Sequence, residues 1–321
     1  RKRDGDDDGL DGGGQRGTGP GRRRARSVRT SEGESTDRGE NLQKANPKIS
    51  LPYHGIYRTG PARVRIGRRR GRARVRAEAW GSGAGWLLDR APHWVGLHDD
   101  VDGFDPSLHP KIAELVRRHP GIRLPAAGVI WQELLLVLLG QRVTTTEAVK
   151  SWARIVYEWG EPAPGPCELR LPPSPEVVAA RSYVDLHRFN VERRRADAIL
   201  LAARRANRLE EAAAMEPPDA RTRLSALPGL GAWTATSVIT ATHGDPDTIV
   251  LRDYGLPTMV NYAFTGDARR LVADEGGDEI MCGHLEPWRG HRQRIVRLLF
   301  TAGVGLPRRG PRAVNPDIRR L

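Results

Sequence analysis

The sequence contains few of the residues that build disulfide frameworks or metal clusters. Cys167 and Cys282 are the only cysteines among 321 residues, so neither a disulfide framework nor a four-cysteine metal or iron–sulfur site can form. Cys282, His284 and His291 lie close together in the sequence, but they lack a fourth ligand at a usual spacing, which argues against zinc. We therefore expect no cofactor and a reducing, cytoplasmic location.

Long apolar runs are also missing. The segment from Val129 to Leu139 covers eleven residues even with Gln132 and Glu133 included, whereas a membrane-spanning helix needs about 20. We therefore expect no membrane partner. Because this segment is apolar nearly all round, it predicts a helix buried at the centre of an α-helical domain.

Acidic residues are outnumbered by basic ones. The chain has 52 Lys and Arg against 39 Asp and Glu, a net charge of +13. Taken alone, this charge favours a polyanionic partner, for which nucleic acid and an anionic membrane are the two candidates. Part of the excess is typical of an arginine-rich composition from a GC-rich genome. The basic run from Glu192 to Arg195 and the acidic loop from Gly244 to Asp247 are both expected to be solvated.

Three segments differ in composition. Residues 1–48 have almost no large apolar side chains and predict a disordered, charged tail. Residues 49–105 predict a small β-rich N-terminal domain, because Val64 and Ile66 alternate with arginines in a hairpin-like pattern. Residues 106–321 show helical periodicity and predict an α-helical domain.

The stretch from Leu227 to Pro257 carries the strongest functional pattern, LPGLGAWTATSVITATHGDPDTIVLRDYGLP. It opens with a turn, Pro228 to Gly231, ahead of a helix-like run. The two glycines of this turn permit positive φ and leave backbone N–H groups uncovered at a helix N-terminus, where a phosphate diester can approach. Asp253 stands before the next helix-like segment, where it is also a good N-cap without catalytic duty.

The segment from Leu227 to Ala235, LPGLGAWTA, resembles the hairpin of the helix-hairpin-helix DNA glycosylase superfamily, and most closely that of the bacterial DNA-3-methyladenine glycosylase II group. The superfamily has its catalytic aspartate a fixed distance downstream, and the interval 253 − 231 = 22 matches. The resemblance implies a mainly α fold, α+β overall, with a helix-hairpin-helix core and a small β-rich N-terminal portion. The phosphate-binding hairpin would comprise Pro228, Gly229, Leu230, Gly231, Trp233, Thr234 and Ala235.

The resemblance also implies a reaction. Cleavage of the bond between a base and deoxyribose develops positive charge on the sugar, so an ionised carboxylate near C1′ and an attacking water are needed. Asp253 would be that carboxylate, held ionised at a helix start. Members that also cut the strand carry a Schiff-base lysine where this chain has Trp233. We therefore expect a monofunctional glycosylase without lyase activity.

Two tryptophans predict the base pocket. Alkylated purines such as 3-methyladenine and 7-methylguanine are cationic, so an electron-rich ring would stack on them. Trp233 is one expected wall. Trp288 is the second, because Glu286 to Arg289 resembles a Pro-Trp-Arg stretch of the alkylbase group. Ser237 stands where a relative has Tyr, which predicts a wider pocket.

The turn from Gly140 to Val143 resembles the loop from which family members fill the gap left by a flipped base. An apolar residue such as Leu is expected there, but this chain has Arg142, which would stack and hydrogen-bond instead. Gln141 could share this role as a duplex wedge, and a plain polar turn is the alternative. Thr144 to Glu147 has the form of a capping box that starts the next helix.

Together, these patterns predict a monomeric enzyme that hydrolyses the N-glycosidic bond of alkylated purines in damaged double-stranded DNA, the first step of base excision repair on the nucleoid. The resemblance implies no metal except a monovalent cation at the hairpin backbone. A non-catalytic helix-hairpin-helix protein that binds DNA or recognises lesions is the alternative. A glycosylase for uracil or oxidised bases is disfavoured, because the lyase lysine is missing.

Overall fold

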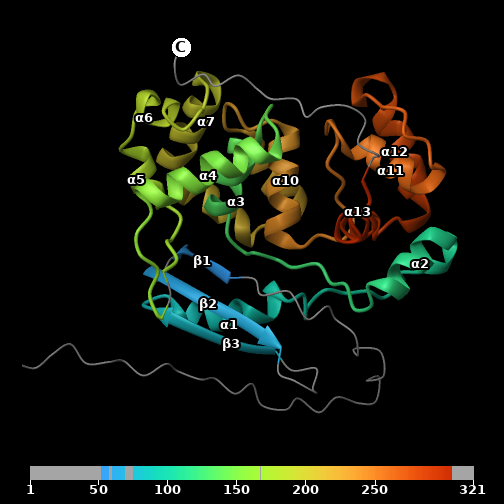
Figure 1. The fold of residues 1–321 in the computed structure, drawn as a ribbon, viewed down its shortest axis with the longest axis horizontal. Helices are drawn as coiled ribbons and strands as arrows, with labels where there is room; N and C mark the ends of the chain where they lie inside the picture. The colour runs from blue at the N-terminus through green and yellow to red at the C-terminus, as the bar shows by residue number, and fades with distance from the viewer. Residues whose placement is uncertain (1–51, 58–59, 69–74, 167, 306–321) are drawn as a thin grey trace, which may run out of the picture.

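The computed structural model describes residues 52–57, 60–68, 75–166 and 168–305, which form a small sheet and a larger helical part (Figure 1). The prediction of a mainly α fold with a small β-rich N-terminal portion is confirmed. The charged tail predicted for residues 1–48 lies outside the described residues. The domain boundaries at residues 48 and 105 stay predictions.

The sheet has three antiparallel strands in the order β1-β2-β3. They are β1 (Pro52–Tyr57), β2 (Gly60–Arg68) and β3 (Val75–Gly81). In the central strand, Val64 lies opposite Tyr53 on one side and Ala79 on the other. The hairpin predicted around Val64 and Ile66 is therefore confirmed as β2 and β3, and β1 adds a third strand.

Thirteen α-helices follow in the part of the chain that the structure describes. They are α1 (Ala84–Trp94), α2 (Pro110–Arg118), α3 (Trp131–Gly140), α4 (Thr145–Trp159), α5 (Pro175–Ala179), α6 (Tyr183–His187), α7 (Arg193–Arg204), α8 (Ala206–Glu210), α9 (Pro217–Ser225), α10 (Ala232–His243), α11 (Leu256–Thr265), α12 (Gly277–Leu285) and α13 (Arg292–Thr301). Four short 3-10 helices accompany them, at Pro106–Leu108, Glu211–Ala214, Ala273–Glu275 and Glu286–Trp288. None of these described helices has the length and apolar character of a membrane span.

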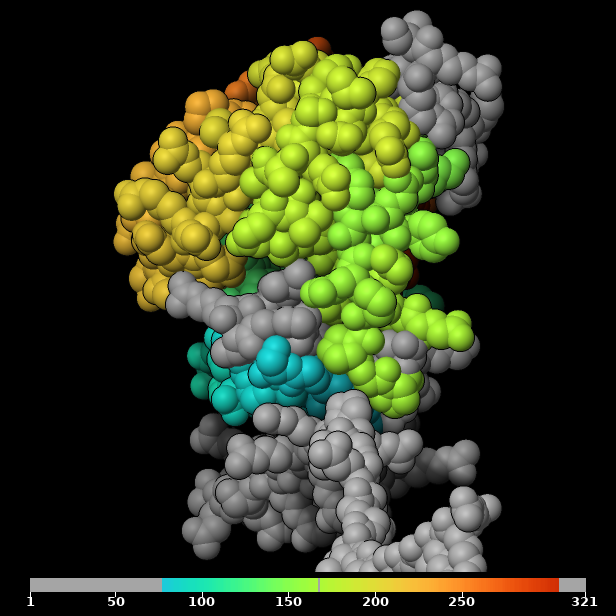
Figure 2. Space-filling view, turned by 90° about the vertical axis from the view of Figure 1, so that its left-hand side faces the viewer, coloured from blue at the N-terminus to red at the C-terminus, as the bar shows by residue number. Residues whose placement is uncertain are grey.

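Three hydrophobic clusters lie in the described part of the chain: two form the cores of two helical lobes, and the third packs α1 against β3. The first lobe, α3 to α10, surrounds one cluster, and the second lobe, α2 with α11 to α13, surrounds the other. Figure 1 shows the lobes side by side, with α1 and the sheet beneath the first lobe. From the left-hand side, α4 to α9 form one surface above α1 (Figure 2).

Helix α3 lies at the centre of the first lobe, as its apolar sequence predicts. Leu134, Leu138 and Leu139 are fully buried. The carboxylate of Glu210 accepts hydrogen bonds from the backbone N–H groups of Ile130 and Trp131, at 3.0 and 3.1 Å, and so satisfies the start of the helix. Helix α4 begins with the predicted capping box, which is therefore confirmed.

Candidate active site

The hairpin from Pro228 to Gly231 joins α9 to α10. Gly229 has φ +89°, and a Cβ there would lie 2.7 Å from the Cβ of Ala198 on α7, so only glycine fits. Leu230 is buried and anchors the turn in the first lobe. No side-chain hydrogen bond caps the start of α10 at Gly231, and a Cβ placed on Gly231 would meet no other atom within 4 Å. This is the arrangement that accepts an anion such as a phosphate.

Asp253 lies beside the start of the same helix. Its Oδ2 accepts a hydrogen bond of 3.0 Å from Nε1 of Trp233, the second residue of α10. Its Oδ1 accepts hydrogen bonds from the backbone N–H groups of Gly255 and Leu256, each 2.9 Å long, at the start of α11. The carboxylate therefore accepts hydrogen bonds from α10 in the first lobe and from the start of α11 in the second lobe. The three donors fix its orientation.

Trp288 is placed differently from the expected pocket wall. It is 4% exposed within the second-lobe core, and its Nε1 donates a hydrogen bond of 2.7 Å to the carbonyl oxygen of Asp105. Its ring centroid lies 5.7 Å from that of Phe264. The described contacts of Trp288 are thus packing contacts. Its place beside Trp233 in a base pocket stays a prediction.

The turn after α3 is tied to the hairpin. Nε2 of Gln141 donates hydrogen bonds to the carbonyl oxygen of Gly229, at 3.1 Å, and to Oγ1 of Thr234, at 2.8 Å. Arg142 is exposed and has φ +57°, a conformation that non-glycine residues rarely adopt. The turn therefore presents Arg142 outward and directs Gln141 to the hairpin. Their roles as a duplex wedge stay predictions.

Arg195 binds the end of α3, just before this turn. The run from Glu192 to Arg195 was expected to be solvated, and this expectation is wrong for Arg195. The Arg195 side chain is buried, and it donates hydrogen bonds to the carbonyl oxygens of Leu139, at 2.9 Å, and Asn190, at 3.1 Å. It thus satisfies a carbonyl at the end of α3. The spacing of four residues from Ile199 places Arg195 on the buried face of α7, but the carbonyl groups that it binds come together only in the tertiary structure.

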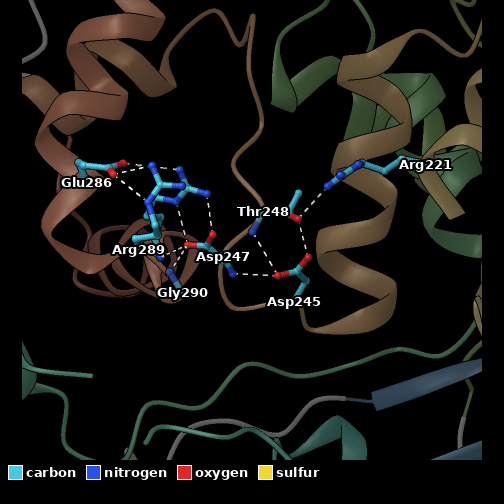
Figure 3. Close-up of polar contacts among 8 residues, drawn as sticks. Arg221, Asp245, Asp247, Thr248, Glu286, Arg289 and Gly290 are labelled. Atoms are coloured by element: carbon cyan, nitrogen blue, oxygen red, sulfur yellow. Dashed lines mark hydrogen bonds and ion pairs between the residues drawn. The ribbon is translucent and has the colours of Figure 1, made fainter. Parts of the chain in front are cut away.

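The loop from Gly244 to Gly255 carries Asp253, and polar contacts hold its first half to both lobes (Figure 3). On the first-lobe side, Oγ1 of Thr248 donates to Oδ2 of Asp245, at 2.5 Å, and accepts from Nη1 of Arg221 on α9, at 2.9 Å. The expectation that the Asp245 carboxylate is solvated is therefore wrong. Its Oδ1 also accepts from the N–H groups of Asp247 and Thr248.

On the second-lobe side, Asp247 makes a paired contact with Arg292 of α13, with Nε–Oδ1 and Nη2–Oδ2 distances of 2.8 and 2.5 Å. The backbone N–H of Gly290 adds a third donor, at 2.7 Å. Burial of Asp247 opposes ionisation, but the hydrogen bonds from Arg292 and Gly290 outweigh it and hold the pKa of Asp247 below its usual range. Asp247 is thus a structural anion, contrary to the expectation of a solvated carboxylate.

The histidines considered as metal ligands have other partners. Nε2 of His284 lies 3.0 Å from Oδ1 of Asn261, and Nε2 of His291 lies 2.9 Å from the carbonyl oxygen of Asp102. Among residues 77–166 and 168–305, no three His, Cys, Asp or Glu side chains are grouped as a metal site. The monovalent cation expected at the hairpin stays a prediction.

Comparison with known proteins adds relatives of both sequence and fold, while no family model matches the chain. The chain is 30% identical over 209 residues to DNA-3-methyladenine glycosylase 2 of Escherichia coli (strain K12), a match that covers 62% of this chain and 69% of that protein. Its fold is similar to that of the 3-methyladenine DNA-glycosylase from Archaeoglobus fulgidus, with a TM-score of 0.62, 19% identity and coverage of 78% and 85% of the two chains. It is also similar to the Clostridium acetobutylicum 8-oxoguanine glycosylase/lyase in complex with double-stranded DNA, with a TM-score of 0.54, 14% identity and coverage of 78% and 84%.

Proposed function

The chain belongs to the helix-hairpin-helix DNA glycosylases related to DNA-3-methyladenine glycosylase 2, and within that family we propose that it releases alkylated purines from duplex DNA by hydrolysis. It is thus a DNA glycosylase that binds DNA, and the proposal concerns its substrate and its use of water. The observation that carries the proposal is the contact between Trp233 and Asp253. That contact brings a carboxylate beside an aromatic ring at the start of α10, next to the hairpin that is expected to bind phosphate.

In the proposed reaction, Asp253 stabilises the positive charge that develops on the sugar as the base leaves, and a water then attacks C1′. The backbone donors on Oδ1 keep the carboxylate in one orientation. Trp233 offers an N–H donor but no amine that could form a Schiff base. The absence of an amine at this position supports a hydrolase without lyase activity.

The proposed complex uses the other predicted residues in turn. The N–H groups after Gly231 bind a phosphate of the lesion strand, and Arg142 enters the gap left by the flipped nucleotide. A cationic purine stacks on Trp233, since the ring carries negative charge on its face. The proposal keeps Trp288 as the second wall, which requires that its packed ring become exposed to the base.

The test is release of free base from methylated duplex DNA, with Asp253→Asn as the matched variant. Asparagine keeps an oxygen that can accept from the N–H groups of Gly255 and Leu256, so the fold is retained while the charge is lost. We expect wild type to release 3-methyladenine or 7-methylguanine. The variant should release it on the order of 100-fold more slowly at equal DNA binding. Strands should break only after alkali treatment.

Two other results would each exclude part of the proposal. If both proteins bind DNA but neither releases any base, the chain is a lesion-recognition module and Asp253 is only a helix cap. If strands break before alkali, an amine elsewhere in the chain supplies lyase chemistry, and the hydrolytic mechanism is wrong.

A further inference from the structure

The residues on either side of Asp253 form an exposed patch on the second lobe. Tyr254 is 77% exposed and Leu251 is 45% exposed, although both are large apolar side chains. The guanidinium carbon of Arg270 lies 4.3 Å from the centre of the Tyr254 ring. One face of the ring is therefore covered by a planar cation. The high exposure shows that most of its remaining surface is open.

Arg270 differs from its charged neighbours. Arg252 pairs with Asp274 at 2.8 Å, and Arg269 pairs with Asp267 at 4.0 Å. No ion pair in the described ranges of the chain includes Arg270, although its side chain is exposed. A guanidinium stacked on a ring keeps its in-plane N–H donors free, so it can bind a phosphate with little further ordering. The charge of Arg270 is thus available to an anion from outside the chain.

The patch lies next to the proposed reaction centre. Consecutive Cα atoms are about 3.8 Å apart, so Tyr254 begins beside Asp253, whose carboxylate contacts the first turn of α10. The hairpin ends at that same helix start, which belongs to the first lobe and has no side-chain cap. DNA that places a phosphate on the hairpin and a sugar at Asp253 therefore comes close to Tyr254 and Arg270. The two lobes would then hold the strand from opposite sides of the flipped nucleotide.

We propose that Tyr254 and Arg270 form a second DNA-backbone contact, in which Arg270 binds a phosphate flanking the flipped nucleotide and Tyr254 packs its open face against the adjoining nucleotide. This inference rests on the proposed function, because that function places the lesion at Asp253. Aromatic rings beside cations are the usual means of holding unstacked nucleotides without reading their sequence. The contact therefore contributes affinity and positioning, and it carries no base specificity.

The experiment measures binding of a short duplex containing a tetrahydrofuran abasic analogue at several salt concentrations. Each phosphate contact that is lost makes the slope of log K against log salt less negative by about 0.9. We expect this change for Arg270→Gln and no change for Arg269→Gln, the adjacent exposed arginine that pairs with Asp267. Tyr254→Phe should bind like wild type, because the ring remains under the guanidinium. Tyr254→Ala should weaken binding several-fold, since it removes the stacking surface.

The inference is refuted if Arg270→Gln has the wild-type affinity and slope, or if Arg269→Gln changes the slope equally, since the effect would then be one of general charge. Thermal unfolding of each variant shows whether it is folded. Because binding is measured without base release, the two proposals fail separately. A wild-type protein that releases no base but whose slope depends on Arg270 retains the contact and loses the proposed function.

Discussion

The buried pair of Arg294 and Asp99 allows a quantitative prediction. Their side chains are 1% and 2% exposed, and the two charge-assisted hydrogen bonds between them are 2.6 and 2.8 Å long. Arg294 also donates to the carbonyl oxygen of Asp100 and to Nδ1 of His291, at 2.6 and 3.2 Å. The substitution Arg294→Met removes all four bonds. Within the described part of the chain, the Asp99 carboxylate then keeps one hydrogen-bond donor, the backbone N–H of Leu124.

Leaving one charge of a buried pair without its partner costs about 3–5 kcal/mol of unfolding free energy. For a domain of this size each kcal/mol lowers the melting temperature by about 2–4 °C, so Arg294→Met should melt about 6–20 °C below wild type. Urea unfolding at pH 7 gives the free energy of unfolding, and thermal unfolding followed by circular dichroism gives the melting temperature independently.

Two controls separate loss of charge compensation from loss of volume. The double variant Asp99→Leu with Arg294→Met removes both charges and should recover most of the loss, because no unpaired charge remains. Arg269→Gln breaks an exposed pair and should cost less than about 1 kcal/mol. A melting temperature for Arg294→Met within about 2 °C of wild type, less than 1 kcal/mol of stability, would refute the reasoning.

Two further predictions concern the elements that position the site. Asp247→Asn removes the charge paired with Arg292 and should cost about 1–3 kcal/mol at pH 7. Folding lowers the pKa of Asp247, so the difference in unfolding free energy between wild type and variant is complete above the unfolded-state pKa of about 3.9. The difference is lost as pH falls through the folded-state pKa. Urea unfolding at a series of pH values from 7 to 3 would detect this loss. A pH-independent difference would contradict this. Gly229→Ala introduces a Cβ 2.7 Å from Ala198 at φ +89°, so it should lower the free energy of unfolding by about 1–3 kcal/mol and weaken DNA binding. Gly231→Ala has open space for its Cβ and an ordinary φ, so it should cost less than about 1 kcal/mol. Equal effects of the two substitutions would contradict the strain assigned to Gly229.

Local patterns in the chain predicted much of the fold. The apolar circumference of α3 and the capping box from Thr144 to Glu147 are confirmed, because each depends on residues within one or two turns of helix. The hairpin before α10 forms for the same reason, since glycine conformation and helix starts are short-range properties. The roles assigned to Asp253 and Arg142 are of another kind and stay predictions.

Such local patterns could not predict contacts between residues that are far apart in the sequence. The sequence by itself determined the capped start of α4, the apolar character of α3 and the interval of 22 residues between Gly231 and Asp253. Only the tertiary structure decided that Trp233 bonds the Asp253 carboxylate, that Asp247 and Arg195 are bound within the protein, and that Trp288 packs in a core. The physical reason is that burial of a polar group is favourable only when the fold supplies a hydrogen-bond partner. The partners of Asp253, Asp247, Arg195 and Trp288 lie 20, 45, 56 and 183 residues away in the sequence.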